Sequence, residues 1–338
     1  MKNGIILGGN IIVDELKDID VYPAHSNLTT IRAKSKACGG LVCNCGLDLA
    51  ILDPEMPVRM IGIVGDDENG KFVRDSFAKH KNIDVTGMKI EGETAFTDAM
   101  CDLKNKTRTF FTYRGSNAKL SPEDFDFDKI KGDLLHIGYI LLLDELDCED
   151  DEYGTKMARV LADAKAHGIK TSIDVVSEEG DRFKKLVAPA LKYTDYCIIN
   201  ESEAEKITGI KITVDGEVDD EKVKQAQKAL FEIGVSEWVI IHAKKGSWGM
   251  TKDGKTCKAA SLNLPREMIK GTTGAGDAFA AGTLYGAYTG LPIEEAMKTG
   301  IAVSNSSILA PGASEGIMSY EDSMKFYNDT IAKYGTME

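Results

Sequence analysis

A glycine-rich stretch late in the chain, residues 271–282, combines the residue types needed to bind a phosphate and to deprotonate a hydroxyl. It reads Gly-Thr-Thr-Gly-Ala-Gly-Asp-Ala-Phe-Ala-Ala-Gly and runs into an alanine-rich segment with helical period. Glycines allow several backbone N–H groups to point to one spot, and the start of a helix adds partial positive charge there. We therefore predict an anion site at the amides of Gly274, Ala275 and Gly276. Asp277 beside them indicates a general base, and the alternative is an Asp that caps the next helix.

A second glycine pair lies near the N-terminus and is followed by an amide side chain. Gly39 and Gly40 precede a helical run expected at residues 45–52, and Asn44 stands between them and that run. The glycines let the backbone approach a ligand closely, while Asn44 offers both a hydrogen-bond donor and an acceptor. This combination suits a polyhydroxylated substrate. The alternative is a turn and a helix cap.

Two more polar groups follow segments that are expected to be strands. Asp14 comes after the first expected strand, where side chains of an open α/β sheet line the crevice, and it could accept hydrogen bonds from two sugar hydroxyls. A solvated loop Asp is the alternative. Asn200 and Glu203 could hold a hydrated magnesium ion over the phosphates. Alternatively, Asn200 caps the helix expected at residues 204–208 and Glu203 reaches back to it.

Composition limits the classes of partner. The chain has 338 residues, with 41 Lys and Arg against 54 Asp and Glu, and a formal net charge of −13. It contains no basic run that could follow a nucleic-acid backbone or an anionic membrane, so neither partner is expected. No apolar run approaches the roughly 20 residues of a membrane span, and we expect a cytoplasmic protein. Seven cysteines, an odd number, favour reduced thiols over a disulfide framework.

The elements that must position these groups alternate between short apolar runs and helical patterns. This alternation predicts an α/β fold with a central, mostly parallel sheet and helices on both faces. Helices are expected at residues 155–167 and 219–233, each stopped by a glycine. The expected strands are residues 5–9, 58–64, 134–138, 170–175, 196–200 and 238–242.

Two regions break this alternation, residues 15–37 and 91–117. Within the second region, residues 94–100 and 108–113 resemble the strands of an antiparallel hairpin without a crossover helix. We predict that both regions pair as a small β-sheet lid over the crevice at the ends of the parallel strands. The expected large domain comprises the remaining residues, 1–14, 38–90 and 118–338.

Taken in chain order, these stretches resemble the ribokinase-like (PfkB) carbohydrate kinase family over nearly the whole chain. The family's first signature matches Gly39 to Asn44, continued by Gly62 and by residues 65–70, and its second matches the Gly-Ala-Gly-Asp of residues 274–277. Asn200 and Glu203 match its Asn-x-x-Glu motif, and Asp14 matches its substrate-binding Asp. The resemblance implies a β-sheet lid and makes the loop at residues 65–70, which has the spacing of a phosphate-binding P-loop, a structural turn.

The resemblance also implies ATP and Mg²⁺ as cofactors. Two departures are present: Ile241 and Ala243 replace the Thr and first Gly of a nucleotide-binding Thr-x-Gly-x-x-Gly stretch, and Gly271 replaces an Asp found in potassium-activated members. K⁺ dependence is therefore an open question, with backbone carbonyls of residues 310–314 as the remaining ligands for a weaker site. Nucleotide contacts are expected at Asn200, Lys244, Gly246, Gly249, Thr273 and Asn305.

By this resemblance the expected activity is ATP-dependent phosphorylation of a hydroxyl of a small sugar or sugar acid, of the fructokinase, ribokinase or 2-keto-3-deoxygluconate kinase type. Arg114 in the lid could pair with a substrate carboxylate, or it is a surface or lid-packing charge. A nucleoside kinase remains an alternative, since lid aromatics could stack a base. A non-catalytic sugar sensor is disfavoured by the intact Asp277, and the lid is the expected interface if the chain forms a homodimer. The aromatics concerned are Tyr22, Phe96, Phe110 and Tyr113.

Overall fold

The body of the protein is a nine-stranded sheet. The computed structural model describes residues 2–176, 180 and 182–337. In chain order the strands of this sheet are β1 (Ile5–Gly9), β4 (Val58–Val64), β5 (Ile83–Ile90), β8 (Leu134–Ile140), β11 (Lys170–Val175), β12 (Tyr196–Asn200), β15 (Trp238–Ala243), β16 (Gly246–Thr251) and β17 (Thr256–Ala260). Their order across the sheet is β17-β16-β15-β12-β11-β8-β1-β4-β5. All neighbours from β15 to β5 are parallel, whereas β16 pairs antiparallel with both β15 and β17.

All six predicted strands belong to this sheet, and the predicted fold class is confirmed. Four of them have the predicted bounds, while β8 continues to Ile140 and β15 to Ala243. The prediction missed β5, β16 and β17. These strands are harder to recognise because β5 has exposed positions on both faces and β16 contains two glycines and a serine.

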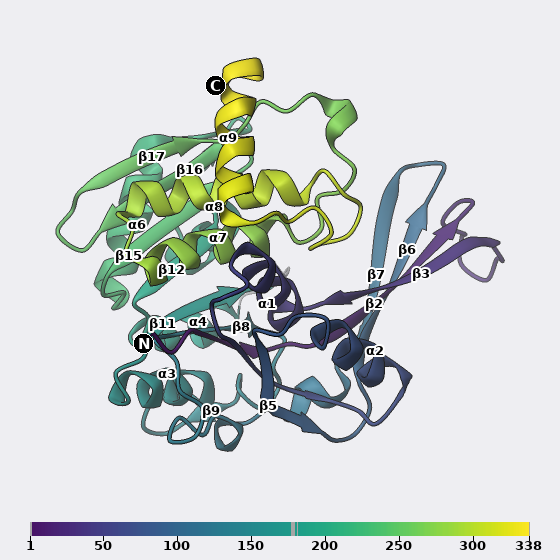
Figure 1. Cartoon of the computed structure of the whole chain (residues 1–338), viewed down its shortest axis with the longest axis horizontal. Coiled ribbons are helices and arrows are strands. Elements are labelled where there is room, and N and C mark those ends of the chain that lie inside the picture. Colours follow the sequence, from purple (N-terminus) through teal and green to yellow (C-terminus); the bar gives the residue numbers. More distant parts are fainter. Residues whose placement is uncertain (1, 177–179, 181, 338) are drawn as a thin grey trace.

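Helices cover both faces of the sheet (Figure 1). The helices on one face are α3 (Lys156–Ala166), α4 (Phe183–Leu191), α5 (Glu201–Thr208) and α6 (Asp220–Ile233). Those on the other face are α1 (Leu41–Leu52), α2 (Glu68–Phe77), α7 (Ala275–Thr289), α8 (Ile293–Ser307) and α9 (Tyr320–Tyr334). Among the described residues, no helix is both long and apolar enough to cross a membrane.

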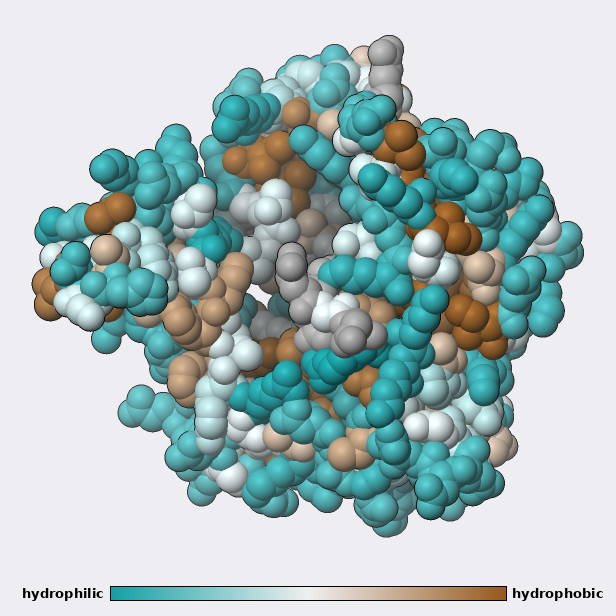
Figure 2. All heavy atoms as spheres, turned by 180° about the vertical axis from the view of Figure 1, so that it is seen from behind, coloured by the Kyte–Doolittle hydropathy of each residue, from teal (hydrophilic) through white to brown (hydrophobic). Residues whose placement is uncertain are grey.

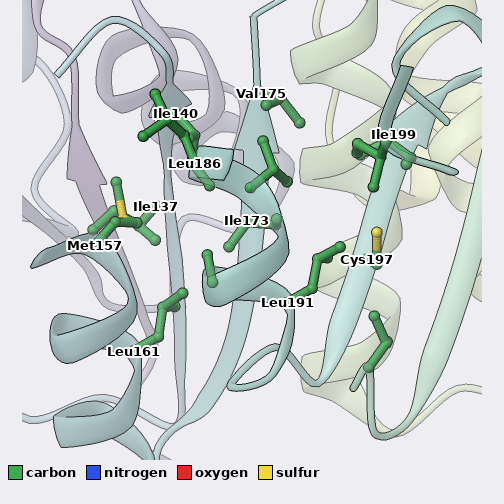
Figure 3. Close-up of a cluster of buried hydrophobic side chains, with 14 of the residues drawn as sticks. Ile137, Ile140, Met157, Leu161, Ile173, Val175, Leu186, Leu191, Cys197 and Ile199 are labelled. Carbon is green, nitrogen blue, oxygen red and sulfur yellow. The ribbon is translucent and has the colours of Figure 1, made fainter. Parts of the chain in front are cut away.

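Each central strand supplies side chains to both layers, because consecutive residues of a strand point to opposite faces. Cys197 and Ile199 pack with the layer of α3 to α6, and Ile198 between them packs with the layer of α1 and α7. Figure 3 shows part of the first layer, where Met157 and Leu161 of α3 lie against the sheet. Burial on both faces explains why these strands are continuous apolar runs in the sequence.

Helix boundaries follow the local capping residues. Thr155 caps α3, with its hydroxyl accepting from the Ala158 N–H, and Asp219 caps α6, so the predicted helices 155–167 and 219–233 are confirmed with their caps included. The predicted start of α1 was too far along the chain: Gly40 is the N-cap, and the helix begins at Leu41 instead of residue 45. The helix predicted at residues 204–208 likewise begins at Glu201.

A separate four-stranded sheet, here called the lid sheet, projects from the body (Figure 1). Its strands are β2 (Ile12–Ile19), β3 (Ile31–Gly39), β6 (Ala95–Asp102) and β7 (Thr107–Tyr113), in the order β3-β2-β6-β7. The predicted hairpin is present as antiparallel β6 and β7, and parallel pairing of β2 with β6 joins the two sequence regions. Seen from the opposite side, the surface is hollowed where the lid sheet meets the body (Figure 2).

The remaining elements are short. They are the hairpins of β9 (Glu149–Asp150) with β10 (Gly154–Thr155) and of β13 (Thr213–Val214) with β14 (Glu217–Val218), and the 3₁₀ turns η1 (Gly115–Lys119), η2 (Pro122–Asp124) and η3 (Arg266–Met268). One predicted location changes with the lid sheet. Asp14 does not directly end the first strand, because β1 stops at Gly9 and Asp14 is the third residue of β2.

Candidate active site

Asp277 is held at the start of α7 by two side chains from other elements. The Asn44 Nδ2–H donates to its Oδ2 at 2.9 Å, and the Tyr139 hydroxyl donates to Oδ1 at 2.8 Å and to Oδ2 at 3.0 Å. The capping alternative for Asp277 is wrong, because the N-cap of α7 is Gly274 and Asp277 is the third helical residue. Burial raises the pKa of Asp277, and the two hydrogen bonds oppose that rise.

The loop before α7 requires glycine at its turning point. Gly274 has a φ of 78°, and a Cβ there would lie 2.6 Å from the Ala313 Cβ. The first N–H groups of a helix have no partner within it, so the amides of Gly276 and Asp277 are free of helical hydrogen bonds. Together with the helix dipole, they make the start of α7 suitable for a phosphate.

These groups line a cavity of about 170 Å³ that also contains the predicted magnesium residues. Gly274, Ala275, Gly276 and Asp277 form one wall, and Asn200 and Glu203 contribute to the other. Tyr139, Asp174 and His242 are further lining residues, which the sequence analysis did not identify. Within the described part of the chain, no Lys or Arg lines this cavity. Burial lowers the pKa of His242 to about 4, so it adds no positive charge at neutral pH.

Asn200 and Glu203 adopt the arrangement given above as the alternative to metal binding. The Asn200 Oδ1 accepts from the Glu203 N–H at 2.9 Å, and the Glu203 Oε2 accepts from the Asn200 N–H at 3.0 Å. Asn200 Nδ2 also donates to Glu203 Oε1 at 2.7 Å. No group of three His, Cys, Asp or Glu side chains suited to a metal occurs among the described residues. The pair of Asn200 and Glu203 can nevertheless fit Mg²⁺, because this ion keeps several waters and needs only one or two carboxylates beside phosphate oxygens.

Asp14 lies in a separate, smaller cavity between the lid sheet and the loop before α7. This cavity of about 40 Å³ is also lined by Arg108, Phe110 and Thr273. Gly39 is necessary here, because a Cβ at this position would lie 2.4 Å from Asp14 Oδ2. Gly40, with a φ of 80°, would place a Cβ 2.5 Å from the Asn10 carbonyl oxygen. The predicted substrate residues Asp14, Gly39 and Gly40 are therefore neighbours.

The ionisation of Asp14 leads to a prediction of pH dependence. Burial, with a further contribution from Asp277, raises the pKa of Asp14 to about 6. Asp14 is therefore ionised above that pH and gains a proton as the pH falls through it, which removes its ability to accept hydrogen bonds from two hydroxyls. We expect kcat/KM for the acceptor substrate to fall by about tenfold per pH unit below about pH 6.

The measurement is a kcat/KM profile between about pH 5 and pH 8 with saturating ATP. ATP affinity over the same range is the control, because Asp14 does not line the cavity that contains Asn200 and Glu203, where the phosphates are expected. A flat profile down to about pH 5 would contradict the assignment of Asp14 to substrate binding.

The structure brings a different lid arginine to the site from the one named in the sequence analysis. Arg114 forms an ion pair with Asp144, and it is absent from the described linings of the Asp14 and Asp277 cavities. Arg108 of β7 instead donates from Nη1 to the Thr273 hydroxyl at 2.7 Å. None of the ion pairs between described residues includes Arg108. Its positive charge is therefore available to a ligand.

The residues expected to contact the nucleotide do not all lie together. Gly246 and Asn305 line one cavity of about 40 Å³ with His242 and Phe279. Thr273 lines the Asp14 cavity instead and accepts a hydrogen bond from Arg108. Lys244 is exposed.

Gly249 has a packing role, and its predicted contact with the nucleotide remains a prediction. It is buried in β16, where a Cβ would lie 2.5 Å from Met297 Sδ and 2.8 Å from Cys257 Sγ. The close approach of α8 explains the glycine at this position without a ligand.

A buried carboxylate at the start of a glycine-preceded helix, at the carboxyl ends of parallel strands and beside a small β-sheet, is the arrangement expected of a small-molecule phosphotransferase. The comparisons with known proteins agree with this class. The chain belongs to the pfkB family of carbohydrate kinases, whose model matches residues 12–319. It is an ATP-dependent sugar kinase, as the resemblance implied.

Curated relatives share about a quarter of their residues with this chain. A 5-dehydro-2-deoxygluconokinase of Geobacillus thermodenitrificans is 26% identical over 321 residues, which cover 91% of this chain and 89% of the relative. A ribokinase of Staphylococcus aureus is 23% identical over 282 residues, 82% of this chain and 84% of the relative. The structure of Arabidopsis thaliana ribokinase complexed with ribose and ATP superimposes with a TM-score of 0.80 at 18% identity, covering 97% of this chain and 99% of that one. This likeness supports the fold.

Proposed function

We propose that this kinase transfers the γ-phosphoryl group of ATP to a hydroxyl of a small sugar acid. The single observation that carries the substrate class is Arg108, which shares a cavity with Asp14 and has no carboxylate partner among the described residues. Asp14 suits hydroxyl groups, and a guanidinium suits a carboxylate, because it offers two parallel donors. The curated relative named 5-dehydro-2-deoxygluconokinase is consistent with an acidic sugar as acceptor.

In this proposal Asp277 takes the proton of the attacking hydroxyl. Asn44 and Tyr139 hold its carboxylate in place through the hydrogen bonds described above. The amides at the start of α7 stabilise negative charge on the phosphoryl group during transfer. Such positioning and electrostatic effects supply most of the catalysis in phosphoryl transfer, since the protein forms no covalent bond.

The cofactors in this proposal are ATP and Mg²⁺, and Asn200 and Glu203 are the residues that would hold the hydrated ion. When bound, the ion would neutralise phosphate charge. This is needed because the cavity is lined by Asp174, Glu203 and Asp277 and by no Lys or Arg of the described chain. A potassium site would have to use carbonyls such as those of Ala310 and Pro311, which lie beside Gly271.

A nucleoside is the second candidate substrate, because Phe110 lines the Asp14 cavity and could stack a base. The other lid aromatics named above do not line this cavity. Phe96 and Tyr113 pack on one another with ring centroids 5.4 Å apart, and both line a different cavity, with Glu15 and Lys36. A sugar acid uses both Asp14 and Arg108, so we prefer it.

The proposal can be tested by an ATP-consumption screen over neutral sugars, sugar acids and nucleosides, with ADP release as the readout. We expect the highest kcat/KM with a sugar acid such as 5-dehydro-2-deoxygluconate or 2-keto-3-deoxygluconate. A nucleoside or a neutral sugar as the preferred acceptor would reject the substrate class. If every compound is inert while some raise the thermal stability, the protein is a sensor and not a kinase.

A further inference from the structure

Asp48 is a buried carboxylate to which the reaction proposed above gives no role. It lies on α1 one helical turn after Asn44, and its side chain is 0% exposed. Neither of its carboxylate oxygens has a hydrogen-bond partner of good geometry among the described residues. A buried polar group without a partner costs free energy, so Asp48 needs an explanation.

Two further oxygens near Asp48 also lack partners. They are Oδ1 of Asn44 and Oγ of Ser314, both buried. Asn44 and Asp48 are four residues apart on one helix, a spacing at which side chains are neighbours, and the Ser314 hydroxyl lies beside the Asp48 carboxylate. Only the Nδ2 group of the Asn44 amide has a hydrogen-bond partner among the described residues, the Asp277 carboxylate. The Asn44 Oδ1 must therefore accept from a donor on the other side.

A proton on Asp48 would satisfy this group of atoms. A protonated carboxyl has one O–H donor and a carbonyl acceptor, so it can donate to Asn44 Oδ1 and accept from the Ser314 hydroxyl. The electrostatics favour this form. Burial raises the pKa of Asp48 well above its ordinary value, the Asp277 carboxylate adds to this rise, and a hydrogen bond from Ser314 opposes it without reversing it.

A bound cation is the alternative way to compensate a buried carboxylate. A cation needs space between its ligands, but Asp48 is absent from the described linings of the cavities at Asp14 and Asp277 and of the groove that Ser314 borders. A proton needs no such space. The packing therefore favours protonation.

We propose that Asp48 is a positioning residue whose O–H donates to Asn44 Oδ1 and so keeps the Asn44 Nδ2–H directed at Asp277. Without this donor, the Asn44 amide could turn by half a rotation and present an oxygen to the Asp277 carboxylate. The position of the general base would then be lost. This inference rests on the proposed function for its effect on turnover, but the protonation of Asp48 can be measured without any substrate.

The first test is infrared difference spectroscopy of wild type against Asp48→Asn at neutral pH, on the free enzyme. We expect the C=O band of a protonated carboxylic acid in the wild type and its loss in the variant. A carboxylate band in its place would overturn the proposal. A change in this band on replacing Na⁺ or K⁺ with choline would show a cation at Asp48 and would also overturn it.

The second test uses turnover with the best acceptor of the screen. We expect Asp48→Ala to lower kcat by about tenfold or more, with little change in KM, since one hydrogen bond to a charged network is lost. The isosteric Asp48→Asn variant should restore most of that loss, because its amide N–H can donate to Asn44. Equal losses in the two variants would overturn the proposal.

A double-mutant cycle separates positioning from a general loss of stability. In an Asn44→Ala background, where there is no amide to orient, Asp48→Ala should have almost no further effect on kcat. Additive losses would show that Asp48 does not act through Asn44. If the wild type phosphorylates nothing in the screen, the proposed function fails, while the infrared result still decides the state of Asp48.

Discussion

The Asp277→Asn variant is expected to lose turnover by about 10²- to 10⁴-fold, the range for removal of a general base. An amide cannot take the proton of the attacking hydroxyl, although it fills nearly the same space. The proposed anion site consists of backbone amides at the start of α7, which this substitution leaves unchanged. ATP should therefore bind with nearly wild-type affinity, so that the loss appears in kcat.

The measurements are kcat with the best acceptor and ATP affinity by calorimetry. Asp329→Asn, at an exposed position on α9, is the matched control and should behave as wild type. Thermal unfolding of both variants checks that the fold is intact. Near-normal turnover of Asp277→Asn would refute its role as the base.

Much of the fold was predictable because its signals are local. The apolar runs of β1, β4 and β12 are buried on both faces of a parallel sheet, so the runs themselves mark the strand bounds. Thr155 and Asp219 are side-chain caps that can be recognised within three residues of the helices they begin. The loop of Gly274, Gly276 and Asp277 could be located for the same reason, since it is one continuous stretch of sequence, and its roles remain predictions.

The rest of the site depends on contacts between distant residues. Arg108 meets Thr273 across 165 positions in the chain, and only the pairing of the lid strands places it there. Arg108 and Arg114 are an even number of positions apart, so strand alternation gives both the same face and could not distinguish them, whereas in the structure β7 ends at Tyr113, before Arg114. Tyr139 was missed because the predicted strand ended at residue 138. Extending β8 by one residue would have placed it at the same crevice as Asp277.

The Arg108→Gln variant is expected to lose the preference for acidic sugars. In our proposal, Arg108 pairs with the substrate carboxylate across the cavity from Asp14. A hydrogen bond to a charged group contributes about 1.5 to 3 kcal/mol, so kcat/KM for the sugar acid should fall by about 10- to 100-fold. Glutamine keeps most of the side-chain length and can still donate to the Thr273 hydroxyl, so the lid contact is largely preserved.

Arg114→Gln is the matched control, because Arg114 directly follows β7, the strand that carries Arg108, and is already paired with Asp144. Both variants should be measured with a sugar acid and with the corresponding neutral sugar. We expect only Arg108→Gln to reduce the ratio of the two kcat/KM values, since the neutral sugar has no carboxylate to lose. An equal loss for both sugars would make Arg108 a residue of lid closure, and a loss confined to Arg114→Gln would return the carboxylate site to Arg114. In the first case the substrate class would rest on the relatives alone, because no arginine would select the carboxylate; in the second case the class would stand and only its arginine would change.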